Sequence, residues 1–348
     1  MDYPLWAWAG FGLFILSMLA LDLGVLNRKA HAVTYREATI WSVVWVTLAL
    51  VFAGLVFWQT NRQTGLEFLT GYVIELSLSV DNLFVFLLIF SYFKVPAKYQ
   101  HRVLFWGVLG ALVMRMTMIA IGATLVERFH WILYLFGAFL IYTGFKMLRQ
   151  DESESNPEEN PVVRFATRLI PITRHYEGDK FFTVENGRKM GTLLLLVLVI
   201  VEVSDLVFAV DSIPAIFGIT TNSFIVYTSN VFAILGLRSL YFLLAGVVEK
   251  FHYLKVGLAV VLMFVGVKML AEGYIHDRFG IGKETIILVS LGFVALVLLS
   301  SVVLSLLRPV PPDEQVEVEL PEGFGTPFDD DQGRLGADER GLPEVRQK

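Results

Sequence analysis

Long apolar runs follow one another along most of the chain, and each is about as long as a membrane-spanning helix. Such a helix needs about 20 mainly apolar residues to cross roughly 30 Å of hydrocarbon. The pattern predicts nine helices, over residues 4–26, 38–58, 67–91, 103–126, 131–149, 190–213, 223–247, 253–272 and 284–307. Two polar stretches interrupt it, an acidic segment at 150–189 and a tail at 309–348 that cannot bury a core. We therefore expect an all-α, polytopic membrane protein with a polar linker loop and a disordered acidic tail.

The composition agrees with this class and excludes several kinds of chemistry. Hydrophobic residues make up 55% of the 348 residues and charged residues 18%, against about 25% charged residues in soluble domains. The chain has no cysteine, which excludes disulfides, thiolate metal sites and cysteine nucleophiles. No basic patch indicates a nucleic-acid partner. The first residues lack the positive segment of a cleaved signal peptide, so we expect the first apolar run to remain as a span.

Lysine and arginine gather in alternate loops, and this bias predicts the orientation of the helices. The loops after the first, third, fifth and seventh helices are basic, with Arg28, Lys29, Arg36, Lys94, Lys98, Arg102, Arg164, Arg168, Arg174, Lys180, Arg188, Lys189, Lys250 and Lys255. The opposite loops are poorer, with Arg62, Arg128, Arg278 and Lys283. The bias places the N-terminus outside and the C-terminal tail in the cytoplasm.

Four motifs occur twice in the same order, which indicates an internal repeat. The pairs are Glu75 to Leu83 with Asp205 to Ile213, Leu112 to Arg115 with Leu235 to Arg238, Glu127 to His130 with Glu249 to His252, and Gly144 to Leu148 with Gly266 to Leu270. Each unit has three helices, an odd number, so the second unit must be inverted in the membrane. Inverted repeats recur in secondary transporters, with the site at the repeat interface; an inert duplication is the alternative.

The repeat divides the chain into six parts. The predicted parts are an N-terminal two-helix hairpin (1–66), a first three-helix repeat (67–149), a cytoplasmic linker loop (150–189), a second three-helix repeat (190–272), a ninth helix (273–308) and the tail (309–348).

Charged residues occur inside the predicted helices, where a charge facing lipid would be unfavourable. These are Glu75, Asp81, Glu202, Asp205, Asp211, Arg115 and Arg238. An ionised side chain at the bilayer centre costs about 2.5–3.5 kcal/mol or more. The seven groups must therefore face one another, a cavity or bound cations.

Helical geometry places most of these acids on two faces. Glu75, Ser79 and Asn82 share one face of the third helix, with Asp81 to one side. In the sixth helix, Glu202, Asp205 and Ser212 fall within one sector.

Asp211 would point away from that sector in an unbroken sixth helix. Pro214 follows it closely and can kink the chain. A local break near Asp211 would also free backbone carbonyls for an ion.

Carboxylates, hydroxyls and one amide are hard oxygen ligands, which suit Mn²⁺, Ca²⁺ or Mg²⁺. No helical histidine lies close to the acids in sequence, which counts against Zn²⁺ or Cu²⁺. Arg115 and Arg238 can balance two of the carboxylates as buried ion pairs. The remaining three need protons or a cation, and a divalent metal exchanged against protons would satisfy that balance.

Several of these motifs resemble one family of membrane proteins. The stretches Glu75 to Asn82, Glu202 to Pro214, Phe182 to Arg188 and Ser229 to Arg238 are similar to the signatures of the TerC family. The resemblance covers roughly residues 5–307 and leaves out the tail.

The resemblance implies a bacterial cytoplasmic (inner) membrane protein. The family is named for tellurium resistance, has Alx-type members associated with alkaline pH and manganese, and is linked to export of metal ions, chiefly Mn²⁺. It implies that Glu75, Asp81, Glu202, Asp205 and Asp211 bind the metal, with Asn82 and Ser212 assisting. Tellurite is an oxyanion that an acidic pocket should repel, so the residues favour a cation.

The leading hypothesis is a proton-coupled transporter that exports a divalent cation, with Mn²⁺ favoured, by alternating access; no tightly bound cofactor is expected. The first alternative is a scaffold or assembly protein linked to metal or tellurite stress, which recruits partner proteins through the 150–189 loop or the tail. A membrane-embedded enzyme ranks lower, because no protease, Ser/His or phosphotransferase signature occurs. A channel is a further alternative.

Overall fold

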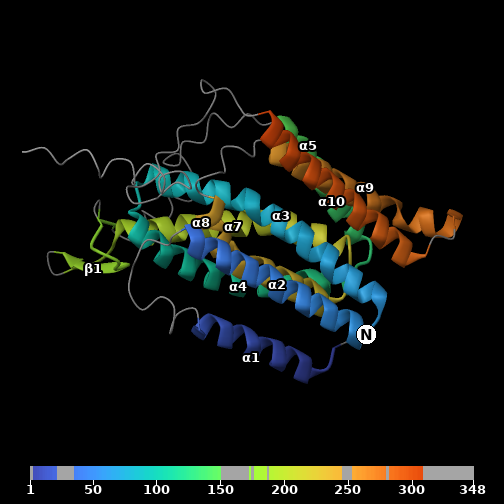
Figure 1. Cartoon of the computed structure of the whole chain (residues 1–348), viewed down its shortest axis with the longest axis horizontal. Helices are drawn as coiled ribbons and strands as arrows, with labels where there is room; N and C mark the ends of the chain where they lie inside the picture. The colour runs from blue at the N-terminus through green and yellow to red at the C-terminus, as the bar shows by residue number, and fades with distance from the viewer. Residues whose placement is uncertain are drawn as a thin grey trace, which may run out of the picture.

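The computed structural model describes residues 3–21, 35–149, 172–173, 176–185, 188–244, 253–279 and 282–308, without the side chains of 20, 21, 81, 84, 188 and 272–279. Within these ranges each predicted helix is present, and the helices run side by side as one bundle (Figure 1). Their bounds are α1 Leu5–Leu21, α2 Tyr35–Gln59, α3 Arg62–Tyr92, α4 Ala97–Arg128, α5 Ile132–Arg149, α7 Leu193–Phe217, α8 Ser223–Leu244, α9 Tyr253–Phe279 and α10 Lys283–Leu307. The all-α prediction is confirmed.

The helices have the length and composition that a bilayer requires. Among the described helices, eight are long and apolar enough to cross a membrane, and α1 is a shorter apolar helix of 17 residues. Large apolar side chains such as Leu13, Leu50, Val113 and Leu296 are exposed on the outside of the bundle. In water this surface would be unfavourable, whereas against lipid tails it is the expected one.

Helices α3 and α4 begin earlier than predicted because their polar first turns resemble loops in sequence. The side chain of Asn61 caps α3, with Oδ1 accepting a hydrogen bond from the backbone N–H of Thr64 at 2.8 Å. Helix α3 therefore begins at Arg62, five residues before the predicted start. Helix α4 similarly includes Lys98 and Arg102 in its first two turns.

Helix α7 has no break near Asp211. Helix α7 continues through Pro214 to Phe217. Pro214 lies in the last turn, where it removes one backbone donor, while its carbonyl still accepts from the N–H of Gly218 at 3.0 Å. Asp211 therefore keeps the direction that an unbroken helix gives it.

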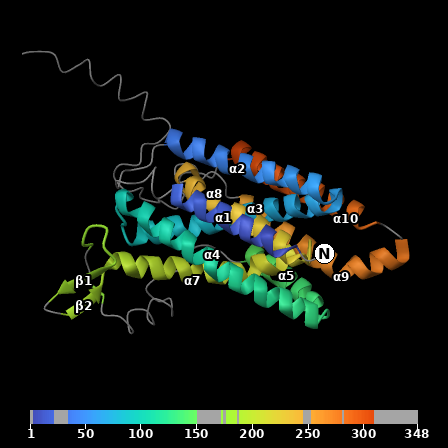
Figure 2. The ribbon, with the colours of Figure 1, turned by 90° about the horizontal axis from the view of Figure 1, so that it is seen from below.

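A short antiparallel hairpin, not predicted from the sequence, lies within the linker and the residues after it. Strand β1 (Phe182–Glu185) pairs with β2 (Arg188–Gly191), from Phe182 opposite Gly191 to Glu185 opposite Arg188. It lies beyond the start of α7 (Figure 2). We call this side of the bundle the hairpin end, and the opposite side, where α7 ends and α8 begins, the vestibule end.

The hairpin segment is bound to the turn between α3 and α4. The Tyr176 hydroxyl donates to the Phe93 carbonyl at 2.7 Å, and Asp179 forms an ion pair with Arg102. Burial raises the pKa of Tyr176 above its ordinary value. These contacts fix the described part of the linker against the bundle.

The helices of the two predicted repeats pack across the repeat boundary, α3 on α8, α4 on α7 and α5 on α9. Because α3 corresponds to α7 and α4 to α8, the first two pairs are equivalent. Glycines allow α5 and α9 to approach closely. A Cβ on Gly144 would lie 2.7 Å from the carbonyl oxygen of Ala259, and one on Gly266 would lie 2.6 Å from that of Gly137.

The separation along the chain between Gly144 and Gly266 equals that between Gly137 and Ala259. Exchanging the two repeats therefore converts the Gly144–Ala259 contact into the Gly266–Gly137 contact. An approximate two-fold relation between the repeats requires this. The inverted repeat itself stays a prediction from the sequence.

Candidate functional site

The side chain of Arg115, on α4, lies inside the bundle and is only 2% exposed. It forms an ion pair with Glu75 of α3, which is also buried. On its other side it faces Asp205 of α7, with Nη2 3.4 Å from Oδ1 and Nε 3.5 Å from Oδ2. One guanidinium thus joins carboxylates from two helices, one from each predicted repeat.

Two uncharged side chains complete this group. Arg115 Nη1 donates to Oδ1 of Asn230, on α8, at 2.7 Å and to Oγ of Ser212 at 3.3 Å. Asn230 Nδ2 in turn donates to Glu75 Oε2 at 3.2 Å. We call Glu75, Arg115, Asp205, Ser212 and Asn230 the Arg115 network. It connects α3, α4, α7 and α8 through buried polar atoms.

Within the network, two carboxylates face one guanidinium. If both carboxylates are ionised, the group carries a net negative charge in a buried place. A buried charge without a partner is unfavourable. The network can therefore be neutral only with a bound proton or a further cation.

Glu202 and Asp211 are also on α7, but neither carboxylate pairs with Arg115. The Glu202 carboxylate packs against the backbone of α4 at Gly110, where a Cβ would overlap it. The Asp211 carboxylate instead accepts a hydrogen bond from Thr143 of α5 at 3.2 Å. The unbroken α7 explains the separation of Asp211 from Asp205.

Asn82 and Asp211 line a cavity of about 240 Å³ between α3, α5, α7 and α9. Lys146 and Lys255 also line it. We call it the Asp211 cavity.

The structure therefore brings together some of the predicted site residues and separates others. Glu75, Asp205, Ser212 and Arg115 meet, Asn82 shares a cavity with Asp211, and Glu202 packs against Gly110 without pairing with Arg115. The side chain of Asp81 is outside the described part, and Arg238 is partly buried on α8. Among the described residues, no three acidic or histidine side chains form a group that could hold one metal ion. The metal-ligand roles stay predictions, as does charge balance by Arg238.

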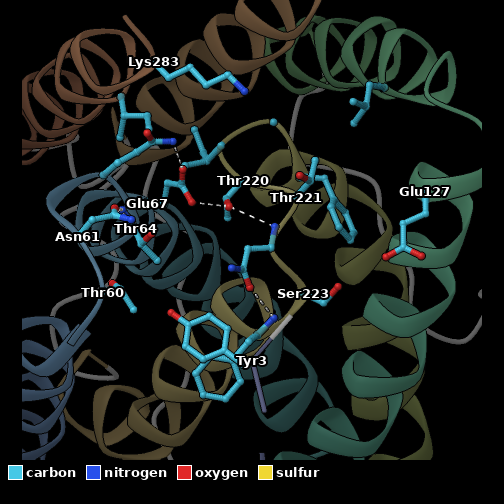
Figure 3. Close-up of a pocket in the computed structure, with 18 of the residues that line it drawn as sticks. Tyr3, Thr60, Asn61, Thr64, Glu67, Glu127, Thr220, Thr221, Ser223 and Lys283 are labelled. Carbon is cyan, nitrogen blue, oxygen red and sulfur yellow. Dashed lines mark hydrogen bonds between the residues drawn. The ribbon is translucent and has the colours of Figure 1, made fainter. Parts of the chain in front are cut away.

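A second polar cavity opens at the vestibule end. It measures about 810 Å³ and lies between the ends of α2, α4 and α7 and the starts of α3, α8 and α10. We call it the vestibule. Glu67 and Thr220 meet on its wall, and Glu127 stands on another side (Figure 3).

Within the vestibule, Glu67 accepts hydrogen bonds from two neighbours. Thr220 Oγ donates to Glu67 Oε2 at 2.6 Å, and Gln63 Nε2 donates to Glu67 Oε1 at 2.9 Å. Burial raises the pKa of Tyr3, which also lines this space.

Sequence reasoning missed Asn230, Thr143 and the vestibule residues as parts of a site. Asn230 lies within the Ser229 to Arg238 stretch that carries the family resemblance, and that was its available signal. Thr143 is a hydroxyl residue in an apolar helix, where such residues usually bond to their own backbone. Thr220 begins a short polar run between two helices, which resembles an ordinary loop.

Comparison with known proteins identifies the family. Residues 60–310 match the integral membrane protein TerC family. An uncharacterized membrane protein of Myxococcus xanthus is 56% identical over 301 residues, covering 86% of this chain and 92% of that protein.

Two further relatives also match over most of the chain. The Escherichia coli K12 protein named "Putative membrane-bound redox modulator Alx" is 52% identical over 278 residues, covering 77% of this chain and 87% of its own length. An uncharacterized membrane protein of Rickettsia bellii is 39% identical over 298 residues, covering 85% and 99%. No solved structure matches the chain significantly. The chain belongs to the TerC family of integral membrane proteins.

Proposed function

We propose that this protein exports a divalent metal cation, above all Mn²⁺, across the bacterial inner membrane in exchange for protons. The Arg115 network is the observation that carries this proposal. It buries two carboxylates, an amide and a hydroxyl in the middle of a membrane bundle, at a junction of both predicted repeats. Intramembrane charges of this kind mark ion pathways in membrane proteins.

The network has one carboxylate more than it has guanidinium groups, and this excess negative charge favours a cation. A cation that enters between Glu75 and Asp205 would neutralise the charge that Arg115 leaves uncompensated. Carboxylate, amide and hydroxyl oxygens are hard ligands, which favour Mn²⁺, Mg²⁺ or Ca²⁺ over softer metals. Protons compete for the same oxygens, and this competition supplies the exchange.

The name of the Alx relatives as redox modulators fits this proposal indirectly. The chain has no cysteine, so its own residues cannot carry out thiol–disulfide exchange. Export of a redox-active metal ion such as Mn²⁺ would change the redox state of the cytoplasm without thiols.

Orientation follows from the basic loops. The predicted topology places the hairpin end in the cytoplasm and the vestibule end outside. In this orientation the Arg115 network receives the cation from the hairpin side and releases it towards the vestibule.

The proposal is tested in bacterial cells that lack their own manganese exporters. Cells that make the native chain should hold less manganese than cells with an empty vector, measured by elemental analysis after a manganese load. Asp205→Asn should abolish this effect, because it removes one carboxylate of the network without changing its size. Asp179→Asn is the matched control, since Asp179 is an exposed acid outside the helices.

Unchanged manganese with the native chain, at normal protein levels in the membrane, would contradict the proposal. Export by Asp205→Asn at the native level would remove the network from the pathway.

A further inference from the structure

Polar side chains recur on one face of α3 between residues 67 and 82. Glu67, Gly71, Glu75, Ser79 and Asn82 fall within about 120° of arc at 100° per residue. This face starts in the vestibule at Glu67, passes the Arg115 network at Glu75 and ends at Asn82 in the Asp211 cavity. It therefore links the vestibule to the Asp211 cavity past the Arg115 network.

Two buried groups on this face have no hydrogen-bond partner among the described residues. They are Ser79 Oγ and Asn82 Nδ2, on side chains that are 0% and 3% exposed. Buried polar atoms are almost always hydrogen-bonded, to protein or to water. Such atoms indicate positions for water or a passing ion along this face.

The space in front of this face is narrowest at Gly71, one helical turn further along α3 than Glu67. A Cβ at this glycine would lie 3.0 Å from Cδ1 of Ile216 and 3.1 Å from Oγ of Ser229. Helices α7 and α8 thus press on α3 here, between the vestibule and the Arg115 network. The absence of a side chain at Gly71 is what leaves them room.

The turn after Ile216 is held by a hydrogen bond to Glu67 in the wall of the vestibule. Thr220 lies in this turn, four residues after Ile216, and donates to Glu67. Thr220 also accepts a hydrogen bond from the backbone N–H of Asn222 at 3.2 Å. Glu67 therefore fixes the segment that carries Ile216 against α3.

We propose that the vestibule is the water-filled mouth of the cation pathway and that Gly71 and Ile216 form its inner gate, held shut by the hydrogen bond from Thr220 to Glu67. The ligand of the mouth is a hydrated divalent cation. A cation at Glu67 competes with Thr220 for the carboxylate, which frees the α7–α8 turn and moves Ile216 away from Gly71. The cation role rests on the proposed export function, whereas the mouth and the gate rest on the geometry alone.

The test is cysteine accessibility, for which the chain is suited because it has no native cysteine. Single variants Thr64→Cys, in the vestibule, and Ser229→Cys, at the gate, are treated in intact membranes with a positively charged methanethiosulfonate reagent. Leu50→Cys is the control, since Leu50 is 51% exposed on the outer surface of α2, where lipid excludes a charged reagent. We expect Thr64→Cys to react, and Ser229→Cys and Leu50→Cys to remain unmodified.

The second step opens the gate. Thr220→Val keeps the shape of the side chain but removes the hydroxyl that bonds to Glu67. In this background Ser229→Cys should gain reactivity, and Leu50→Cys should not. Addition of Mn²⁺ to the Ser229→Cys variant with Thr220 intact should produce the same gain if a cation opens the gate.

Each result decides one part of the proposal. An unreactive Thr64→Cys would show that the vestibule is not open to water. A Ser229→Cys that reacts as fast as Thr64→Cys, with Thr220 intact, would show that Gly71 and Ile216 do not form a closed gate. If Thr220→Val changes nothing, the hydrogen bond does not hold the gate. These results need no transport, so the mouth and gate can stand if export fails.

Discussion

Arg115 on α4 and Asp205 on α7 face each other inside the bundle through two contacts, Nη2 to Oδ1 at 3.4 Å and Nε to Oδ2 at 3.5 Å. These contacts use Nε and Nη2, so Nη1 of the guanidinium can interact with Glu75, Asn230 and Ser212. Arg115 is therefore shared between the carboxylates of two helices. Because of this sharing, loss of Arg115 should destabilise the bundle.

Replacing Arg115 by methionine leaves two buried carboxylates without their cation. Removing one partner of a buried ion pair costs about 3–5 kcal/mol. We expect Arg115→Met to lower the free energy of unfolding by this amount, measured by denaturant unfolding in detergent, and Glu75→Gln in the same chain to restore part of it.

The control for Arg115→Met is Arg102→Met, which breaks the exposed pair with Asp179. Exposed pairs contribute about 0–1 kcal/mol. Equal losses in the two variants would show that the buried network has no special stabilising role.

Gly266 on α9 is expected to tolerate no side chain. A Cβ there would meet the backbone oxygen of Gly137 at 2.6 Å and Cγ1 of Ile141 at 2.8 Å. Because a backbone oxygen cannot turn aside, Gly266→Ala should push α5 and α9 apart, at about 1–3 kcal/mol. The midpoint of thermal unfolding in detergent should fall.

Gly292 in α10 provides the matched substitution, since a Cβ at this glycine would have nothing within 4 Å of it. Alanine favours helix over glycine by about 1 kcal/mol, so Gly292→Ala should raise the midpoint slightly. A lower midpoint for both variants would mean that close packing is not the cause.

Lys268 on α9 is buried and donates from Nζ to the carbonyl of Gly218 at 2.9 Å. This carbonyl lies at the C-terminal end of α7, where the helix dipole favours a positive charge by about 0.3–1 kcal/mol, up to about 2 when partly buried. Lys268→Met should loosen the α7–α8 turn, seen as faster hydrogen exchange over residues 218–222. Lys98→Met, at the exposed start of α4, should leave that exchange unchanged; the same exchange rates in both variants would refute the role of Lys268.

Tyr176 should remain protonated at a pH where an ordinary tyrosine ionises, because burial raises its pKa. Its hydroxyl can donate to the Phe93 carbonyl only in the protonated form. The raised pKa in the folded state stabilises the fold below the ordinary tyrosine pKa. This contribution is lost as the pH rises through the folded-state pKa.

The test for Tyr176 is the ultraviolet difference titration between the native chain and Tyr176→Phe. We expect the missing ionisation step to lie above the ordinary tyrosine range. A step within the ordinary range would show that the linker contact does not persist in solution.

The helices could be predicted from the sequence because lipid imposes a length and an apolar composition on each of them. The starts of α3 and α4 could not, since their first turns lie among polar residues and depend on a cap such as Asn61. The hairpin was missed although Asn186 and Gly187 separate its strands, and this dipeptide is a strong hairpin signal.

Only the charged residues of the site could be predicted from the sequence. Buried charges must find partners, so the sequence pointed to Glu75, Arg115 and Asp205. It could not show that Asp211 faces α5, because that depends on whether Pro214 breaks α7. Asn230 and Ser212 join Arg115 through tertiary contacts, which the spacing along one helix does not reveal.

The most direct test of the export function is Mn²⁺ flux in liposomes that contain the purified protein, with a manganese-sensitive dye inside and a pH gradient across the membrane. We predict that the native chain moves Mn²⁺ against the direction of proton flow and that reversing the gradient reverses the flux. Asp205→Asn should show no flux, and Asp179→Asn should match the native chain. Folded native protein that moves no Mn²⁺, Mg²⁺ or Ca²⁺ under either gradient would contradict the account and would leave the Arg115 network as a structural ion pair.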